Sequence, residues 1–197
     1  MRRVFIAILS VLIFFIHSSF ISTKVIQDFT LRNTNGKWVS TRDYKDAKGF
    51  IVIFTCNHCP FAKLYTKRMN ELNTKFSKLN VPLIAINSMD TLVYEDETFE
   101  MMQEKAKHDK FNFPYLQDAN QQIGLKFGAE HTPMAYLIWK EKGQWIVKYK
   151  GAIDDNGEKP ALATSYIVNA TNELLLNKEV TLPVTQSFGC RIIYRNK

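Results

Sequence analysis

The sequence predicts one α/β domain with a parallel central sheet, and three observations lead to this prediction. The apolar, β-branched run 51–54 is typical of a buried strand, and apolar residues at helical spacing follow it in 60–80. The same order returns in the apolar run 81–87 and the amphipathic segment 94–109. A chain that alternates strands and helices in this way favours a parallel sheet. With 197 residues and 46% hydrophobic content, the chain can bury one core but is short for two.

The N-terminal segment, residues 1–22, is predicted to be an export signal. Two arginines follow Met1, and residues 4–16 are apolar except for Ser10. A basic start before an apolar stretch of this kind is typical of a signal peptide. The cleavage site is not distinct, so the alternative is an uncleaved anchor that tethers the protein to a membrane through residues 4–21. Both interpretations place the remaining domain, residues 23–197, in the periplasm or another extracytoplasmic compartment.

A β-hairpin is predicted ahead of the central strand. Residues 26–31 and 37–40 flank the sequence Asn33-Thr-Asn-Gly36, and Asn-Gly supplies the two positive-φ positions of a tight turn. The polar segment 41–49 then leads to the central strand.

Shorter elements complete the predicted fold. Asp118 is placed to cap a short helix that ends at Gly128, and Pro133 stands at the first step of a strand. We expect 180–197 to be an ordered surface extension of the same domain. The other predicted elements are a strand over 113–116, the short helix through 127, strands over 131–139 and 144–150, a loop over 151–156 and a final helix over 160–177.

Two cysteines lie at the junction between the central strand and the helix that follows it. The first turn of a helix has backbone N–H groups without partners, and these favour a thiolate over a thiol. Pro60 suits the first turn, because its missing N–H had no acceptor to lose. Cys56 and Cys59 are therefore predicted to form a reactive dithiol on a rigid edge of the sheet.

The third cysteine, Cys190, lies near the C-terminus. Three cysteines are too few for a disulfide-stapled scaffold, so we interpret the close pair as chemical rather than structural. Cys190 has two interpretations: an additional redox thiol, which is resolving or intermolecular, or a small residue packed under the tail.

The order of elements, with CxxC between strand and helix and Thr-Pro opening a later strand, resembles the thioredoxin fold. The longer form found in AhpC/TSA redoxins and TlpA-like proteins is the most similar. More narrowly, four motifs resemble peroxiredoxin-like proteins of the thioredoxin family that carry a Cys-Asn-His-Cys sequence. They are Thr55-Cys-Asn-His-Cys-Pro60, Thr132-Pro133, Gly151-Ala-Ile-Asp-Asp-Asn156 and Gly189-Cys190.

This resemblance implies a central mixed sheet flanked by helices, with an N-terminal hairpin and an inserted βα unit. It implies that Cys56 is the exposed nucleophile and Cys59 the resolving thiol. It also implies that Pro133 is a cis proline, and that the backbone of Thr132 faces the sulfurs and pairs with the substrate chain. The cis form costs little only before proline.

The chain departs at two places from the families that it resembles. Thioredoxins have tryptophan before the first cysteine and an acid in the preceding strand, whereas this chain has Thr55 and no acid in 50–54, so the proton relay for Cys59 is unassigned. Peroxiredoxins place Thr or Ser three residues, and Pro seven residues, before the peroxidatic cysteine. Here those positions before Cys56 hold Ile53 and Gly49.

The resemblance and the dithiol predict an exported thiol–disulfide oxidoreductase. The alternative is a peroxiredoxin-like thiol peroxidase with an antioxidant role. A copper-binding metallochaperone of thioredoxin fold is a further alternative, although such proteins use CxxxC spacing. The expected partners are protein thiols and disulfides, together with a redox partner protein.

His58, between the cysteines, is predicted to stabilise the Cys56 thiolate, against the simpler interpretation of a solvent-facing side chain. Asp154-Asp155 fits a turn better than a pair of acids for proton transfer or metal binding.

A metal site needs more ligands than the cysteine pair and His58 supply, and His108 and His131 are the nearest donors in type. No metal and no cofactor are therefore predicted. The net charge of +7 comes from scattered residues, which argues against nucleic acid as a partner.

Overall fold

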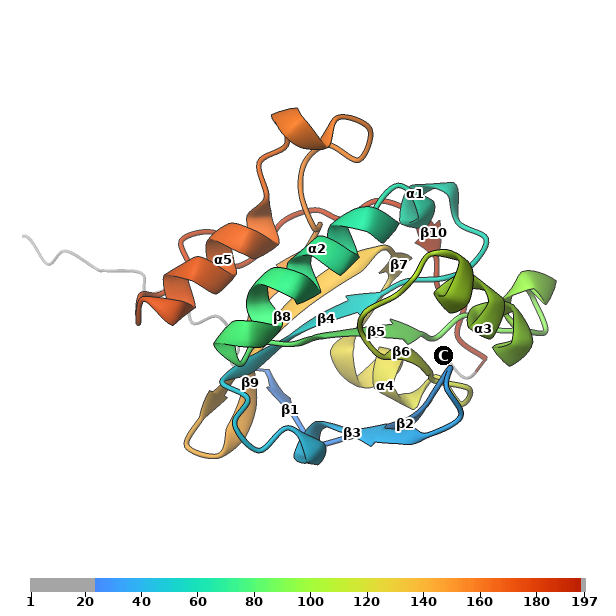
Figure 1. Ribbon diagram of the computed structural model, residues 1–197, viewed down its shortest axis with the longest axis horizontal. Coiled ribbons are helices and arrows are strands. Elements are labelled where there is room, and N and C mark those ends of the chain that lie inside the picture. The colour runs from blue at the N-terminus through green and yellow to red at the C-terminus, as the bar shows by residue number, and fades with distance from the viewer. Residues whose placement is uncertain (1–23, 196–197) are drawn as a thin grey trace, which may run out of the picture.

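The computed structural model describes residues 24–195, and the predicted signal segment lies outside the described residues. It confirms the predicted α/β class: eight strands form one sheet in the order β1-β9-β8-β4-β5-β6-β2-β3, with helices on both faces (Figure 1). Within 24–195, every helix is too short or too polar to span a bilayer. The strands of this sheet are β1 (Val25–Ile26), β2 (Thr30–Asn33), β3 (Trp38–Ser40), β4 (Gly49–Phe54), β5 (Leu83–Asn87), β6 (Tyr115–Gln117), β8 (Met134–Glu141) and β9 (Gln144–Gly151).

The central strand β4 is buried along its whole length, because helices and loops cover both faces of the sheet. Phe50, Val52 and Phe54 point into one apolar cluster, and Ile51 and Ile53 point into the other. β4 pairs parallel with β5 and antiparallel with β8. The sheet is therefore mixed, with the predicted parallel part, β4-β5-β6, at its centre.

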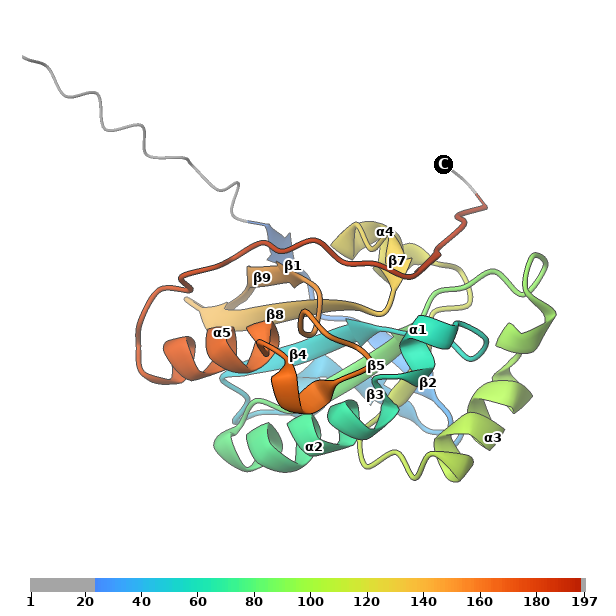
Figure 2. The ribbon, with the colours of Figure 1, turned by 90° about the horizontal axis from the view of Figure 1, so that it is seen from above.

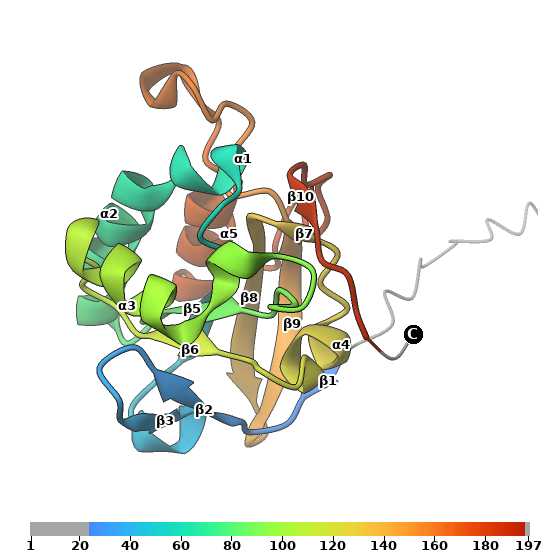
Figure 3. The same cartoon turned by 90° about the vertical axis from the view of Figure 1, so that its right-hand side faces the viewer.

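The helices lie where the sequence predicts them, with shorter bounds. They are α1 (Pro60–Lys63), α2 (Thr66–Phe76), α3 (Phe99–His108), α4 (Gln122–Phe127) and α5 (Tyr166–Leu175). Helices α2, α3 and α5 lie on one face of the sheet, and α4 lies on the other (Figure 3). Their buried side chains belong to two separate apolar clusters, one on each face. Asp118 accepts hydrogen bonds from the N–H groups of Ile123 and Gly124, and α4 ends at Gly128 with φ +70°, as predicted.

The single helix predicted over 60–80 is wrong, because the chain breaks between α1 and α2. The N–H groups of Leu64 and Tyr65 bond three residues back, to Phe61 and Ala62. This tighter turn brings the Tyr65 hydroxyl to Asp154, where it donates to Oδ1 at 3.1 Å. The break separates a short helix that carries the cysteine pair from a longer helix that packs on the sheet.

The N-terminal hairpin forms from β2 and β3, and Gly36 takes φ +84° in its turn. The expectation that Ile26 belongs to this hairpin is wrong. Val25 and Ile26 form β1, which pairs with β9 at the opposite edge of the sheet.

A second, two-stranded sheet joins β7 (His131–Thr132) to β10 (Cys190–Arg191). The C-terminal segment leaves α5, runs beside β9 and then reaches β7 (Figure 2). The predicted surface extension is therefore an ordered part of the domain, and it ends next to the cysteine pair.

Candidate active site

The cysteine pair lies at the carboxyl end of β4, and Cys59 is the N-cap residue of α1. Both cysteine residues are 0% exposed. The expectation of an exposed Cys56 is therefore wrong for this arrangement of the chain. Thr132 and the C-terminal segment close over the pair: Thr132 contacts both sulfurs, and the backbone N–H of Cys190 donates to Sγ of Cys59 at 3.4 Å.

Thr132 and Pro133 are joined by a cis peptide bond, as the resemblance implies. Thr132 is fully buried, and its Oγ1 lies 3.0 Å from Sγ of Cys56. Its carbonyl oxygen lies 3.2 Å from Sγ of Cys59. The structure thus brings together four of the residues that the sequence singles out.

The two sulfurs share their protons unequally. The pKa of Cys59 is lowered to about 4, chiefly because the Cys56 thiol donates a hydrogen bond to its sulfur. The side chain and backbone of Cys190 and the backbone N–H of Ala62 act in the same direction. The same Cys59 contact, burial and the negative charge of Glu97 raise the pKa of Cys56. The thiolate predicted at the helix start therefore belongs to Cys59 while the site is closed.

Glu97 supplies a buried carboxylate that the sequence analysis missed. It lies in the turn before α3 and is 1% exposed. Its oxygens accept hydrogen bonds from the N–H groups of Asn57 at 2.9 Å and His58 at 3.0 Å, and from Nδ2 of Asn87 at 2.5 Å. Thioredoxins carry an acid in the strand that corresponds to β4. In this chain the acid reaches the Cys-Asn-His-Cys loop from the turn before α3 instead. In the sequence it reads as one member of the acidic run 95–97, which is typical of a solvated surface.

His58 is held by Glu97 rather than facing solvent. Its Nδ1 lies 2.5 Å from Oε1 of Glu97, and its ring stacks on Tyr94 with centroids 4.6 Å apart and planes 17° from parallel. One ligand atom from each of Cys56, His58 and Glu97 lies within 4.8 Å of the others, so this group has the donors for a metal ion. The carboxylate already binds two backbone amides, the side-chain amide of Asn87 and the imidazole, so the group is arranged as a hydrogen-bond network. His108 instead pairs with Asp109, at the end of α3.

Cys190 is a third sulfur in the same place. It lies opposite Thr132 in the β10–β7 pair, and these two strands are side by side in Figure 3. Burial and a hydrogen bond to Cys59 raise the pKa of the Cys190 thiol to about 12. Unlike the other two cysteines, Cys190 is partly exposed.

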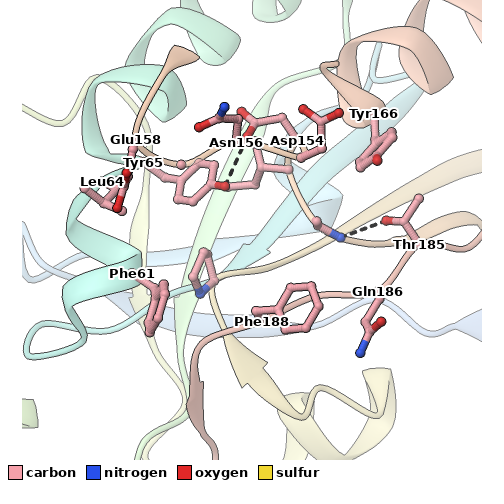
Figure 4. A pocket seen from close by; sticks show the side chains of 15 residues that line it. Phe61, Leu64, Tyr65, Asp154, Asn156, Glu158, Tyr166, Thr185, Gln186 and Phe188 are labelled. Atoms are coloured by element: carbon pink, nitrogen blue, oxygen red, sulfur yellow. Dashed lines mark hydrogen bonds between the residues drawn. The ribbon is translucent and has the colours of Figure 1, made fainter. Parts of the chain in front are cut away.

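A hollow of about 500 Å³ opens beside Pro133 (Figure 4). Its apolar wall includes Phe61 of α1, Leu64 directly after α1 and Phe188 of the C-terminal segment, all exposed. At its far side Asp154 is buried, forms an ion pair with Arg68 and accepts the N–H of Asn156. The turn interpretation of this acid is confirmed, and the ion pair anchors the turn to α2.

A comparison with protein families identifies the family of this chain, because the profile of the AhpC/TSA family matches residues 23–173. The chain belongs to the AhpC/TSA family. With its fold, this membership makes the protein a thioredoxin-fold redox protein. No curated protein matches the chain.

Solved structures of other proteins have a similar fold. A hypothetical protein from Sinorhizobium meliloti 1021 is 27% identical, with a TM-score of 0.80 over 89% of this AhpC/TSA chain and 95% of its own. An uncharacterized protein from Geobacillus kaustophilus is 28% identical, with a TM-score of 0.79 over 89% and 93%. A putative thiol:disulfide interchange protein DsbE from Chlorobium tepidum shares the fold, with 15% identity, a TM-score of 0.56 and coverage of 79% and 94%.

Proposed function

We propose that this AhpC/TSA protein is an exported thiol–disulfide oxidoreductase that uses the Cys56–Cys59 dithiol. The observation that carries the proposal is the contact of both sulfurs with Thr132, directly before Pro133. A substrate chain that pairs with the backbone of Thr132 brings its own disulfide to the same two sulfurs.

The chemistry is thiol–disulfide exchange. Sγ of Cys56 attacks one sulfur of a substrate disulfide, the other substrate sulfur leaves with the electron pair and takes up a proton, and a mixed disulfide forms. Sγ of Cys59 then attacks Cys56, releases the second substrate thiol and leaves a Cys56–Cys59 disulfide. The substrate gains two electrons and two protons, and the protein loses them. The reverse sequence donates a disulfide.

Cys56 is buried, and its pKa is raised by the contact with Cys59, by burial and by Glu97, so its surroundings must open before it can react. Because the C-terminal segment pairs with the Thr132 edge, it has to leave that edge before a substrate chain can bind there. Glu97 and His58 act as positioning residues in this proposal. Glu97 fixes the amides of Asn57 and His58, and its hydrogen bond to the imidazole sets how much negative charge the Cys56 thiolate meets. The low pKa of Cys59 stabilises the reduced form, which makes the couple more oxidising.

The test is the reduction potential of the Cys56–Cys59 couple in glutathione buffers, together with insulin reduction. We expect Cys56→Ser and Cys59→Ser each to lower turnover at least a hundredfold. Wild-type turnover by both variants would overturn the proposal. Peroxide consumption coupled to NADPH and dependent on Cys56 would favour the thiol peroxidase instead, and an unchanged anaerobic Cu(I) titration after Cys56→Ser would count against copper handling at this pair.

The export part of the proposal rests on residues 1–22. Fusion of these residues to a reporter enzyme that is active only outside the cytoplasm tests it. Activity that disappears when Leu9 is replaced by Arg supports export, because a charge in the apolar stretch blocks a signal. Equal activity of both fusions would contradict it.

A further inference from the structure

The C-terminal segment occupies the backbone edge that the proposed function gives to the substrate. β10 pairs antiparallel with β7, with Cys190 opposite Thr132 and Arg191 opposite His131. Thr132 is the residue whose carbonyl and hydroxyl touch the Cys59 and Cys56 sulfurs. The chain therefore presents one of its own cysteines to the dithiol in the position of a bound substrate strand.

Gly189 allows this close approach. Its φ is +150°, a conformation that favours glycine, and a Cβ atom at this position would lie 2.0 Å from the carbonyl oxygen of Thr132. No side chain fits in that space unless the segment moves away. The close contact with Thr132 therefore requires glycine at the position directly before Cys190.

The segment is fastened on the far side of Cys190 as well. Ile192 is 3% exposed, and its N–H donates to the carbonyl oxygen of Glu130 at 2.9 Å. The side chain of Gln121 donates to the carbonyl oxygen of Ile193 and accepts from the N–H of Arg195. Arg195 also forms an ion pair with Asp90 at 2.5 Å. These bonds place Cys190 by its backbone, independently of any bond at its sulfur.

Cys59 is the sulfur in the middle. It exchanges hydrogen bonds with the thiols of both Cys56 and Cys190, and it accepts the Cys190 backbone N–H. Cys56 and Cys59 are fully buried, and Cys190 is partly exposed. Among the three cysteines, Cys190 is the one that a soluble reductant or partner protein can approach while the segment is docked.

We propose that Cys190 is a third redox thiol that receives the disulfide from Cys59, and that the docked C-terminal segment acts as a built-in substrate strand. In the step, the Cys190 thiol loses its proton and its sulfur attacks Sγ of Cys59. The Cys59–Cys190 bond forms as the Cys56–Cys59 bond breaks, and the Cys56 sulfur leaves with the electron pair and is protonated. No net oxidation occurs: the disulfide moves from two buried residues to a pair with an exposed member.

This inference rests on the proposed function, which supplies the Cys56–Cys59 disulfide. A reductant can then attack Cys190 without the site opening, which returns all three sulfurs to the thiol form with two electrons and two protons from the reductant. The segment thus separates two half-reactions: it opens for the substrate disulfide and stays docked for the reducing partner.

The experiment uses the full chain and one equivalent of diamide, followed by alkylation and mass spectrometry of non-reduced tryptic peptides. We expect Cys56→Ser to form an intramolecular Cys59–Cys190 disulfide in a monomer, Cys190→Ser to form only Cys56–Cys59, and the wild type to contain both. Only intermolecular dimers in Cys56→Ser would overturn the inference. So would a wild type that, after oxidation to completion, contains no Cys59–Cys190 peptide.

A matched pair of variants tests the docking. Gly189→Val in the Cys56→Ser background should lower the yield of Cys59–Cys190 at least tenfold, because the new Cβ meets Thr132. The same change in the Cys190→Ser background should leave the Cys56–Cys59 yield unaltered, and an unchanged near-UV circular dichroism spectrum serves as the control that the variant folds. An equal Cys59–Cys190 yield with and without the Gly189→Val change would mean that docking plays no part. If the proposed function alone fails, Cys56–Cys59 forms in Cys190→Ser but insulin is not reduced.

Discussion

Neutralising Glu97 should increase the thiolate population of Cys56. The two residues have ligand atoms within 4.8 Å of each other, and both are buried. At an effective dielectric constant of about 20, two like charges at this separation repel by roughly 3.5 kcal/mol. His58 and the backbone amides offset part of the carboxylate charge, so we expect Glu97→Gln to favour the thiolate by about tenfold to a hundredfold, roughly 1.4 to 2.8 kcal/mol.

The assay is a titration of thiolate absorbance near 240 nm against pH. It is made in a Cys59→Ser, Cys190→Ser background, so that Cys56 is the only cysteine that titrates. Glu97→Gln should lower the midpoint by about one to two pH units. Glu95→Gln is the matched control, because Glu95 belongs to the same turn and is exposed.

The two variants should therefore separate clearly. Equal midpoints for Glu97→Gln and Glu95→Gln would refute the reasoning, because they would show that the buried carboxylate does not act on the sulfur. A higher midpoint in Glu97→Gln would refute it as well, and would mean that the carboxylate acts by ordering the loop amides rather than by its charge.

Four further results are expected. The pKa of the Cys59 thiol is lowered to about 4 in the folded chain. The Cys59 thiolate therefore stabilises the folded protein fully above the pKa of the unfolded chain, and this contribution is lost as the pH falls through about 4. The urea midpoint of the reduced protein should fall more between about pH 8 and about pH 4 than that of Cys59→Ser. Asp154→Asn should cost about 3 kcal/mol in urea unfolding, because it leaves the buried Arg68 charge unpaired, and Lys67→Ala, at an exposed ion pair, should cost less than about 1 kcal/mol. His58→Ala should lower the reduction potential in glutathione buffers, since Glu97 loses a partner and opposes the thiolate more strongly; an unchanged value would dismiss the role of His58. Phe61→Ser should raise the KM for insulin at least threefold with the reduction potential unchanged, because Phe61 forms part of the apolar wall beside Pro133; a changed potential with an unchanged KM would contradict this.

The sequence predicts those parts of the site that depend on local patterns. Cys56 and Cys59 are placed correctly because a fully buried strand directly precedes the helical spacing. The cis bond before Pro133 is predicted correctly because the order of the surrounding elements resembles the thioredoxin fold. The break after Leu64 is not predicted, since the apolar spacing continues through it. The break places Tyr65 against Asp154, and these two residues are far apart in the chain.

Glu97 and the closed position of Cys190 depend on long-range contacts, and no local pattern carries them. Glu97 is preceded by two other acids, so its sequence environment is that of a surface residue, yet it is buried against the loop that holds Asn57. β10 has only two residues, too few to show any periodicity. Gly189 permits its pairing with β7, and this role appears only when the distance to Thr132 is known.

The unequal exposure of the three cysteines also affects routine thiol counting. A thiol reagent added to the native, reduced protein reacts with Cys190 first, because Cys56 and Cys59 are buried. A brief native count will therefore read fewer free thiols than a denatured one, and could be mistaken for partial oxidation of the sample.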